Sequence, residues 1–433
     1  MISARILYSL SLLYLCFFSE QSQWLSIICP AALAVVSFVY LYQSLDEPKQ
    51  IKHFIFFVLA LKFISLFAFP NLSDDIYRFK WDGVLVSNGI NPYINTPDEI
   101  IKSYSGEFKT ELTTLYPYLN SKPYHTVYPL ISQFAFGLCS KMAGSNLYAF
   151  NILLKCIYLV ADLILLYFLF NLLIKTGYPQ KRILLFYANP LCFVELIGNL
   201  HFELFLILFL CIAISNYNKS KLFRSGFNLG LSVISKLNSF LFAPLFLSKS
   251  NFIQKNFLLT LGFIIPLTAA AWFIFPGIAG YKSSLGLYFH QFEFNSLLYR
   301  HLTEYCDSNK LYDAKKLVGF YLMLCFLVVA FYLFIKGYFN KHSNFSFQTA
   351  WYLIFTYLLL SSTVHPWYLT TLVFLSCFYL PLTGFTWSFL VFCSYARYDL
   401  TVEPYESLLV TMEYIFVFIV LLFELNKMKI HKA

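Results

Sequence analysis

One polar segment, residues 73–83, carries the side chains best suited to chemistry in this otherwise apolar chain. Asp74 and Asp75 stand together in it, and a carboxylate can take a proton from a substrate hydroxyl. The same two acids could instead fill the first turn of a helix capped by Ser73, where negative charge favours the helix dipole. Both interpretations predict that a helix begins here.

Further polar side chains of this segment would share a surface with the acids. At helical spacing Asp75, Arg78 and Asp82 lie on one face, with Trp81 beside them. Gly89 is expected to end the helix. The pattern predicts an amphipathic helix at a membrane surface, in which Arg78, Trp81 and Asp82 contact a substrate and Asp75 acts as a base.

The rest of the chain must hold this helix in a membrane. Of its 433 residues, 59% are hydrophobic and 12% are charged, about half the charged share of a soluble domain. Long continuous apolar runs predict an all-α polytopic transmembrane bundle of about 11–13 spans, with interfacial helices in the outer loops and residues 1–433 as a single membrane domain. The ten cysteines have no disulfide or zinc spacing. The net charge of +9 is assigned to cytoplasmic loops, and no nucleic-acid partner is expected.

Basic clusters predict which loops face the cytoplasm. They lie at residues 49–53, 219–224, 249–255, 336–342 and 427–432. With the N-terminus inside, the two largest polar loops, residues 71–125 and 277–311, fall outside, and the candidate base faces outward. The basic residues at 175–182 break this alternation. Either that loop is an exception, or one apolar run between 126 and 197 does not cross.

The motif Ser-Asp-Asp-Ile-Tyr-Arg-Phe-Lys-Trp-Asp-Gly, followed by Gly-Ile-Asn-Pro-Tyr at 89–93, resembles a first-external-loop motif. It is found in bacterial mannosyltransferase-like members of the C-superfamily of glycosyltransferases (GT-C), membrane enzymes that use polyprenyl-phosphate-linked sugars. Similar pieces follow in the family's order at 127–130, 189–195, 198–203, 236–237, 292–296 and 365–368. The resemblance implies that the acidic pair supplies the catalytic carboxylate, with Asp75 preferred over Asp74. Leu130 and Glu203 depart from the residues that relatives often have, Pro and Asp.

The remaining candidates would bind substrate. A departing lipid phosphate needs fixed cations, for which Arg78, Arg300, His365 and Lys236 are candidates. Lys236 could equally extend its amine to the nearest membrane surface. The other candidates are His201 and Glu203, which could position the acceptor, and Asn295, which could contact sugar hydroxyls. Glu203 with Asp75 could also bind a divalent ion. No cofactor is assigned, and a divalent metal stays an option.

Together these features predict an integral membrane glycosyltransferase of a bacterial inner membrane. It would transfer a hexose, with mannose favoured, from a polyprenyl-phosphate donor to a glycan or lipid-linked acceptor on the outer face. Membrane lipid is the remaining partner. A transporter or flippase of lipid-linked sugars is one alternative, and it predicts two related halves with broken helices. A polymerase or ligase of surface polysaccharide and a non-catalytic scaffold are the others.

Overall fold

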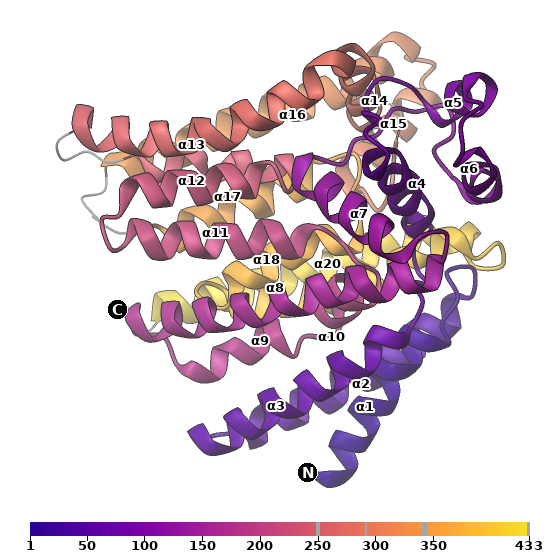
Figure 1. The fold of residues 1–433 in the computed structure, drawn as a ribbon. Helices are drawn as coiled ribbons and strands as arrows, with labels where there is room; N and C mark the ends of the chain where they lie inside the picture. Colours follow the sequence, from indigo (N-terminus) through magenta and orange to yellow (C-terminus); the bar gives the residue numbers. More distant parts are fainter. Residues whose placement is uncertain (248–251, 291, 340–344, 431–433) are drawn as a thin grey trace.

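The fold is a helical bundle, as the apolar runs predict. The computed structural model describes residues 1–247, 252–290, 292–339 and 345–430, which contain no strand beyond a single bridge pair between Phe294 and Thr363. Its long central helices lie side by side along one direction in Figure 1: α8 (Leu147–Lys175), α11 (Glu203–Tyr217), α12 (Leu222–Val233), α13 (Phe252–Ile274) and α16 (Tyr312–Phe339).

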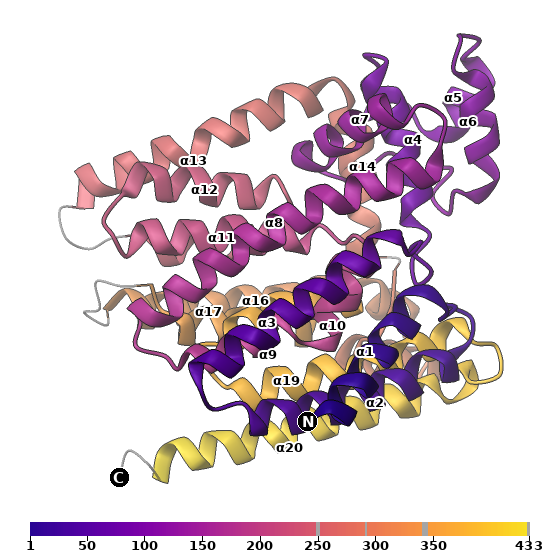
Figure 2. The same cartoon turned by 60° about the horizontal axis from the view of Figure 1, so that its bottom comes forward.

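The two ends of the chain complete this bundle. The N-terminal helices are α1 (Ile2–Phe17), α2 (Trp24–Ser44) and α3 (Pro48–Ile64), and the C-terminal ones are α17 (Phe347–Leu360), α18 (Leu369–Ser376), α19 (Pro381–Leu390) and α20 (Glu406–Ile430). Figure 2 shows α20 beside α19, and the ring of Phe38 in α2 lies 5.3 Å from the ring of Phe385 in α19, so segments from opposite ends of the sequence pack together. Residues 1–433 were predicted as one membrane domain, and that division stays a prediction.

Fewer helices than expected are long enough to cross a membrane. In the described ranges six helices meet the length and hydropathy of a span, or seven if one bent pair counts as a single span. Three shorter apolar helices of 10–17 residues accompany them. The prediction of 11–13 spans was too high, because apolar runs such as 181–197 and 366–382 are divided at Asn189-Pro190 and at Pro381 into pieces too short to cross.

The bent pair turns inside the bundle. Residues Pro190–Gly198 and Glu203–Tyr217 meet at 111°, and Leu200 between them has φ +64°. The Tyr158 hydroxyl of α8 donates to the Leu200 carbonyl at 2.5 Å. A carbonyl freed by such a turn is costly in an apolar environment unless it is paired. Tyr158 therefore stabilises the turn that carries residues 201–203.

Short helices gather at one end of the bundle (Figures 1 and 2). They are α4 (Asp75–Ser87), α5 (Pro97–Ser103), α6 (Lys109–Leu115), α7 (Leu130–Ala143), α14 (Ile278–His290) and α15 (Leu297–Ser308). All belong to, or directly follow, the two large polar loops that were predicted to lie outside. Helix α7, expected to be a span, has 14 residues and packs along α4. It is too short to cross, which removes the conflict in the predicted alternation.

The basic loop at 175–182 lies at the opposite end. Lys181 forms an ion pair with Asp46 of the α2–α3 loop at 2.7 Å. Burial and the nearby charge of Lys175 lower the pKa of Lys219 in the α11–α12 loop. This loop therefore lies near the α2–α3 and α11–α12 loops, as expected if one apolar run between 126 and 197 does not cross. The basic residues Lys249, Lys341, His342 and Lys432 lie outside the described residues.

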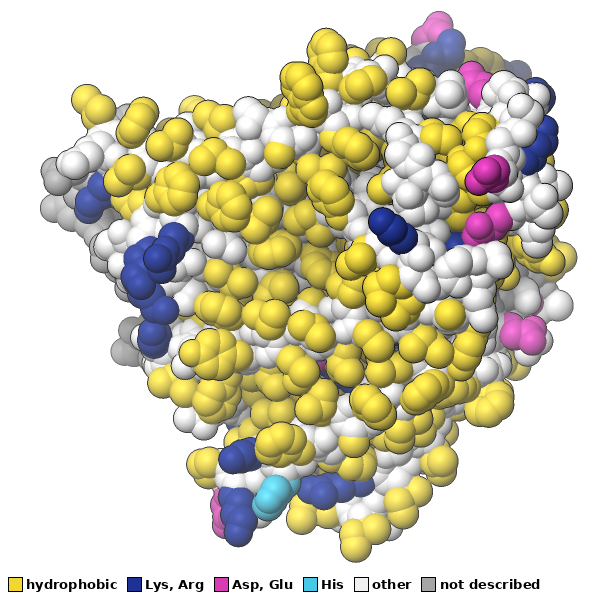
Figure 3. All heavy atoms as spheres, in the orientation of Figure 1, with side chains coloured by type: hydrophobic (Ala, Val, Ile, Leu, Met, Phe, Trp, Pro, Cys, Tyr) yellow, Lys and Arg dark blue, Asp and Glu magenta, His cyan; other side chains and the backbone are white. Residues whose placement is uncertain are grey.

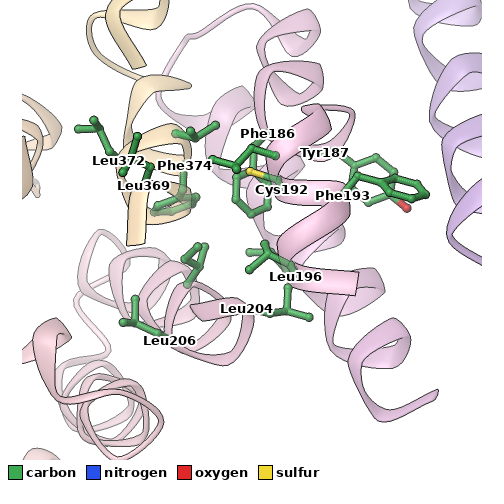
Figure 4. Close-up of a cluster of buried hydrophobic side chains, with 14 of the residues drawn as sticks. Phe186, Tyr187, Cys192, Phe193, Leu196, Leu204, Leu206, Leu369, Leu372 and Phe374 are labelled. Carbon is green, nitrogen blue, oxygen red and sulfur yellow. The ribbon is translucent and has the colours of Figure 1, made fainter. Parts of the chain in front are cut away.

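The core combines dense apolar packing with close helix contacts. Figure 4 shows Phe186 and Leu196 on the side that faces Leu369 and Phe374 of α18, and the ring centroids of Phe186 and Phe374 are 6.1 Å apart. Helices α12 and α13 pack closely through small residues: a Cβ added to Gly226 would lie 1.9 Å from the Leu259 carbonyl oxygen. Small residues at such contacts are typical of membrane helix pairs.

The outer surface suits a bilayer. Figure 3 shows hydrophobic side chains across the middle of one face, with most of the charged side chains near its edges. Exposed apolar residues include Trp272 at 86% and Val328 at 70%. Such an apolar band would be unfavourable in water and is expected where lipid replaces water. The protein is an integral membrane protein.

Candidate active site

One large cavity brings together residues that are far apart in the sequence. It has a volume of about 890 Å³. Its polar wall includes Asp74 and Asp75 of the first outer loop, His201 after the broken segment, Lys236 after α12, and His365. Arg78 also lines the cavity, so six of the eleven predicted site residues lie in its wall.

The acidic pair lies where α4 begins. Asp74 occupies the N-cap position, one residue later than expected, while Ser73 Oγ accepts a hydrogen bond from the Asp75 amide at 3.3 Å. Asp74 is exposed to the cavity and Asp75 is half-buried. Burial and the adjacent charge of Asp75 raise the pKa of Asp74. Neither carboxylate has an ion-pair partner among the described residues, so both are available to a ligand.

Arg78 and Asp82 hold the first outer loop in place. Arg78 Nε donates to Asp82 Oδ1 at 2.9 Å, and its Nη1 donates to backbone and side-chain oxygens of Ser121 and Tyr124 at 3.1 Å. Asp82 Oδ2 accepts from Thr126 and is fully buried. Arg78 lines the cavity, but its hydrogen bonds are directed to the protein. Asp82, predicted to contact substrate, lies outside the lining.

Helix α4 is buried more deeply than an interfacial helix would be. Trp81, also predicted to contact substrate, packs with Leu112 and Leu115 of α6 instead of lining the cavity. On the other side Phe79 stacks on Phe136 of α7, with ring centroids 4.5 Å apart. Gly83 allows this approach, because a Cβ there would lie 2.6 Å from the Phe136 carbonyl oxygen. These contacts fix the direction in which Asp75 points.

Lys236 provides an ammonium in the same cavity wall. It follows α12, where the backbone becomes extended at φ −158°, and its side chain is 28% exposed. Its Nζ pairs with Glu203 Oε1 and lies 4.8 Å from the ring centroid of Tyr368. Glu203 itself is fully buried and does not line the cavity. The predicted role of Glu203 in contacting substrate therefore has no support from its position.

Two histidines form an aromatic group around Trp367. The rings of His201 and His365 stack on the indole with centroids 3.7 and 4.4 Å away. His201 Nε2 lies 3.2 Å from Glu195 Oε2, although the contact lacks the angle of a hydrogen bond. Burial, with the charges of Lys236 and His201, lowers the pKa of His365 to about 3. At neutral pH His365 is uncharged and can offer hydrogen bonds but not a cation.

The second outer loop pairs its polar groups internally. Asn295 Nδ2 donates to Glu413 Oε1 at 3.2 Å, and Arg300 binds Glu293 and Glu406 at 2.8 Å each. Neither Asn295 nor Arg300 lines the cavity. Their contribution to the site is indirect. The Phe294 backbone pairs with Ser362 and Val364, and the Phe294 ring lies 4.6 Å from the ring of His365.

Sequence reasoning missed one residue beside the acids. Tyr398 lines the cavity, and burial together with the carboxylates of Asp75 and Asp74 raises its pKa to about 12. It stays a neutral hydroxyl that can donate a hydrogen bond. Nothing in its local sequence separates it from the other tyrosines of the chain. Its only signal is its place beside a turn, residues 397–406, on the predicted outer side.

The cavity also has an apolar wall. Leu322, Met323 and Phe326 of α16 line it, together with Phe240 and Leu241 of the 3-10 helix Leu237–Phe246. Both elements belong to the membrane-embedded bundle. The arrangement can therefore hold a ligand with a polar group near Lys236 and a hydrocarbon chain between these elements.

The described residues do not form a complete metal site by themselves. They contain no group of three or more His, Cys, Asp or Glu side chains that could hold an ion. Glu203, which was expected to join Asp75 in such a site, is paired with Lys236 below the cavity wall. We derive no chemical step through a metal.

Residues 13–249 match the family model described as "Alpha-(1->6)-mannopyranosyltransferase, N-terminal domain". This match covers more than half of the chain. The chain belongs to this mannosyltransferase family. It is therefore a membrane glycosyltransferase, and the resemblance to GT-C enzymes read from the motif at 73–93 is confirmed. No curated protein and no solved structure matches the chain.

The family match covers only part of the cavity wall. It includes Asp74, Asp75, His201 and Lys236, while His365 and the second outer loop lie beyond it. The roles of individual residues in this mannosyltransferase are not given by the match, and they rest on the geometry described above.

Proposed function

We propose that this protein transfers mannose from a polyprenyl-phosphate carrier to a hydroxyl of a glycan or lipid-linked acceptor, with Asp75 as the base. The family supplies the sugar, and its description suggests an α-(1→6) linkage for the product. The observation that carries the proposal is one cavity that joins an unpaired acidic pair, an ammonium and a long apolar wall. Transfer from a lipid-linked sugar phosphate needs a base for the acceptor hydroxyl, a cation for the phosphate and an apolar surface for the lipid chain.

The reaction is a single displacement. The acceptor hydroxyl gives its proton to Asp75, its oxygen forms a bond to the anomeric carbon, and the bond from that carbon to the phosphate oxygen breaks. Polyprenyl phosphate leaves with one more negative charge than it had as the diester. Lys236 is the cation placed to stabilise that charge, because Arg78 directs its hydrogen bonds to Asp82 and to the first outer loop.

Neighbouring side chains would orient the reactants. Tyr398 beside the acids can donate to Asp75 or to a sugar hydroxyl, and neutral His365 can bind a hydroxyl without competing for the proton. The apolar wall of α16 and Leu237–Phe246 would hold the first isoprene units of the carrier. Burying each methylene of such a chain contributes about 0.8 kcal/mol.

The site is proposed to face the outside of a bacterial inner membrane. Its polar wall comes from the end of the bundle that carries the two large loops, whereas Lys175, Lys181 and Lys219 lie at the other end. By the positive-inside rule the basic end is cytoplasmic. The carrier would then present its sugar from the outer leaflet.

The test is sugar transfer by the purified protein in nanodiscs. Polyprenyl-phosphate-mannose and polyprenyl-phosphate-glucose are offered as donors with an α-(1→6)-linked mannose oligosaccharide as acceptor. We expect the mannose donor to be consumed, and Asp75→Asn to lower the rate by about 10²–10⁴-fold, the usual contribution of a general base. Asp74→Asn is run beside it. Asp313→Asn, an exposed acid at the start of α16, is the matched control with full activity.

Each outcome bears on a different part of the proposal. Turnover that survives both Asp75→Asn and Asp74→Asn would contradict the assigned base. Consumption of the glucose donor alone would contradict the assigned sugar. A protein that moves the lipid across the membrane without transferring its sugar would be a flippase.

A further inference from the structure

Glu203 is a buried carboxylate whose purpose the reaction above does not explain. It begins α11, directly after the 111° turn, and none of its surface is exposed. Its Oε1 accepts from Lys236 Nζ, and its Oε2 has no hydrogen-bond partner. An ionised group at such a place is costly unless it is paired. Lys236 is the cation that the structure places beside it.

The two partners differ in their access to the cavity. Lys236 lines it and its side chain is 28% exposed, while Glu203 stands behind it. A second contact restrains the ammonium, because the ring of Tyr368 lies 4.8 Å from Nζ. A free lysine side chain loses up to about 2 kcal/mol of rotamer entropy when it is fixed. Here the protein has already fixed the lysine before a ligand arrives.

We propose that Glu203 is a positioning residue that holds Lys236 toward the donor phosphate. It touches neither substrate nor the reacting atoms, and acts only through the ammonium. This inference rests on the proposed function, in which Lys236 binds the phosphate. It also replaces the two roles expected from the sequence, because a residue behind the wall can neither contact the acceptor nor share a metal with Asp75.

The geometry gives Glu203 one further effect. A lysine without a fixed partner can fold back toward the nearest membrane surface. The extended backbone at Lys236 lies between α12 and the 3-10 helix Leu237–Phe246, and the side chain reaches Glu203 at the start of α11. Removing the carboxylate therefore leaves the ammonium present but misplaced, so the cost appears mainly in donor binding.

A double-mutant cycle tests the assignment. Glu203→Gln keeps the shape and removes the charge, and we expect it to raise the KM for polyprenyl-phosphate-mannose by about tenfold, the value of one hydrogen bond to a charged group. Its kcat should change less. Glu203→Asp keeps the charge and should recover part of the loss. In a Lys236→Ala background, Glu203→Gln should add no further loss, because its only route to the donor is gone.

A merely structural role would give another pattern. If Glu203→Gln lowers activity by the same factor in the Lys236→Ala background as in the wild type, Glu203 does not act through Lys236 and the inference is wrong. The melting temperature of each variant shows whether it still folds. If Glu203→Gln does not fold, Glu203→Asp carries the same cycle.

A second readout needs no donor. The rate at which an amine-selective reagent labels Lys236 is followed by mass spectrometry, with exposed Lys316 as the internal reference. The paired amine should be labelled slowly, and Glu203→Gln should speed its labelling severalfold. Unchanged labelling would overturn the inference. If wild-type protein consumes no donor while labelling responds to Glu203→Gln, the proposed function fails and the pairing stands.

Discussion

Two lysines of this protein meet a buried carboxylate, and their surroundings differ. Lys62 of α3 and Asp162 of α8 lie inside the bundle, with side chains 3% and 2% exposed. The Lys62 ammonium donates to both carboxylate oxygens, at 2.8 and 2.9 Å, and lies 3.7 Å from the ring centroid of Tyr187. Lys236 instead pairs with one oxygen of Glu203, and its side chain remains 28% exposed to the cavity.

The difference separates a pair that joins two helices from a pair that opens onto the cavity. The Lys62–Asp162 pair satisfies both of its charged groups and links α3 to α8 with nothing left for a ligand. The Lys236–Glu203 pair leaves donor hydrogens of the ammonium facing the cavity. An ionisable residue within a membrane bundle is usually taken to have a function. These two pairs indicate that such a residue can bind a ligand only where its unpaired atoms face a cavity.

Breaking the Lys62–Asp162 pair should have the largest effect, and it should lower the stability of the protein without changing its catalysis. Asp162→Asn leaves Lys62 charged and without a full partner, which costs about 3–5 kcal/mol of unfolding free energy for a buried pair. Thermal unfolding in detergent measures the loss. The kcat/KM of the protein that remains folded should match wild type. A rise in donor KM or a fall in kcat without loss of stability would contradict the comparison.

Removing Lys236 should lower catalysis as well as stability. Lys236→Ala is expected to lower kcat/KM for the donor by about 10²-fold, the usual loss for one group that stabilises transition-state charge. Its melting temperature should fall as well, because the fully buried carboxylate of Glu203 loses its partner, so kcat/KM is measured on the protein that remains folded. Lys316→Ala, at an exposed position on α16, is the control. Full activity of Lys236→Ala would remove the difference between the two pairs.

Apolar replacement sharpens the same contrast. A buried ion pair exchanged for well-packed hydrophobic residues is often neutral or stabilising. The double variant Lys62→Met with Asp162→Leu should therefore recover most of the stability lost in Asp162→Asn, and remain active. Lys236→Met with Glu203→Leu should fold and stay inactive. Transfer assays and unfolding curves on both double variants give the result, and an active Lys236→Met, Glu203→Leu protein would contradict it.

The smallest expected effect is a pH shift at the acidic pair. Burial and the charge of Asp75 raise the pKa of Asp74, so the pair reaches its full ionisation at a higher pH than an ordinary aspartate. Activity that needs the ionised pair is lost as the pH falls through that range. Asp74→Asn removes the group with the raised pKa, so the fall of kcat/KM on the acidic side of the pH profile should move to lower pH. A shift of this fall to higher pH would contradict this.

The sequence was sufficient for features that depend on local pattern. The apolar runs predicted an all-α membrane bundle, and the motif at 73–83 correctly indicated a helix that begins beside Asp74 and Asp75. It also identified the family. The roles of the two acids are predictions that the Asp75→Asn and Asp74→Asn transfer assays test.

Contacts between distant residues could not be predicted in this way. Lys236 and Glu203 are 33 positions apart, and Lys62 and Asp162 are 100 apart, so no helical periodicity relates them. Asp162 was expected to be paired or structural, but its partner was unknown. Trp81 and Asp82 have the composition of a binding surface, yet packing on α6 and hydrogen bonding to Thr126 turn them inward. Such outcomes depend on tertiary structure.

The turn at Leu200 has a consequence for biosynthesis. The turn leaves the Leu200 carbonyl without a helical hydrogen bond, and this carbonyl accepts one from Tyr158, which lies 42 positions earlier in the chain. Synthesis proceeds from the N-terminus, and earlier segments are available for packing first. Helix α8 can therefore already stand in the bilayer when residues 193–217 leave the ribosome, ready to receive the exposed carbonyl. Because Tyr158 is synthesised before Leu200, the hydrogen-bond partner of this carbonyl is already present when the turn enters the membrane.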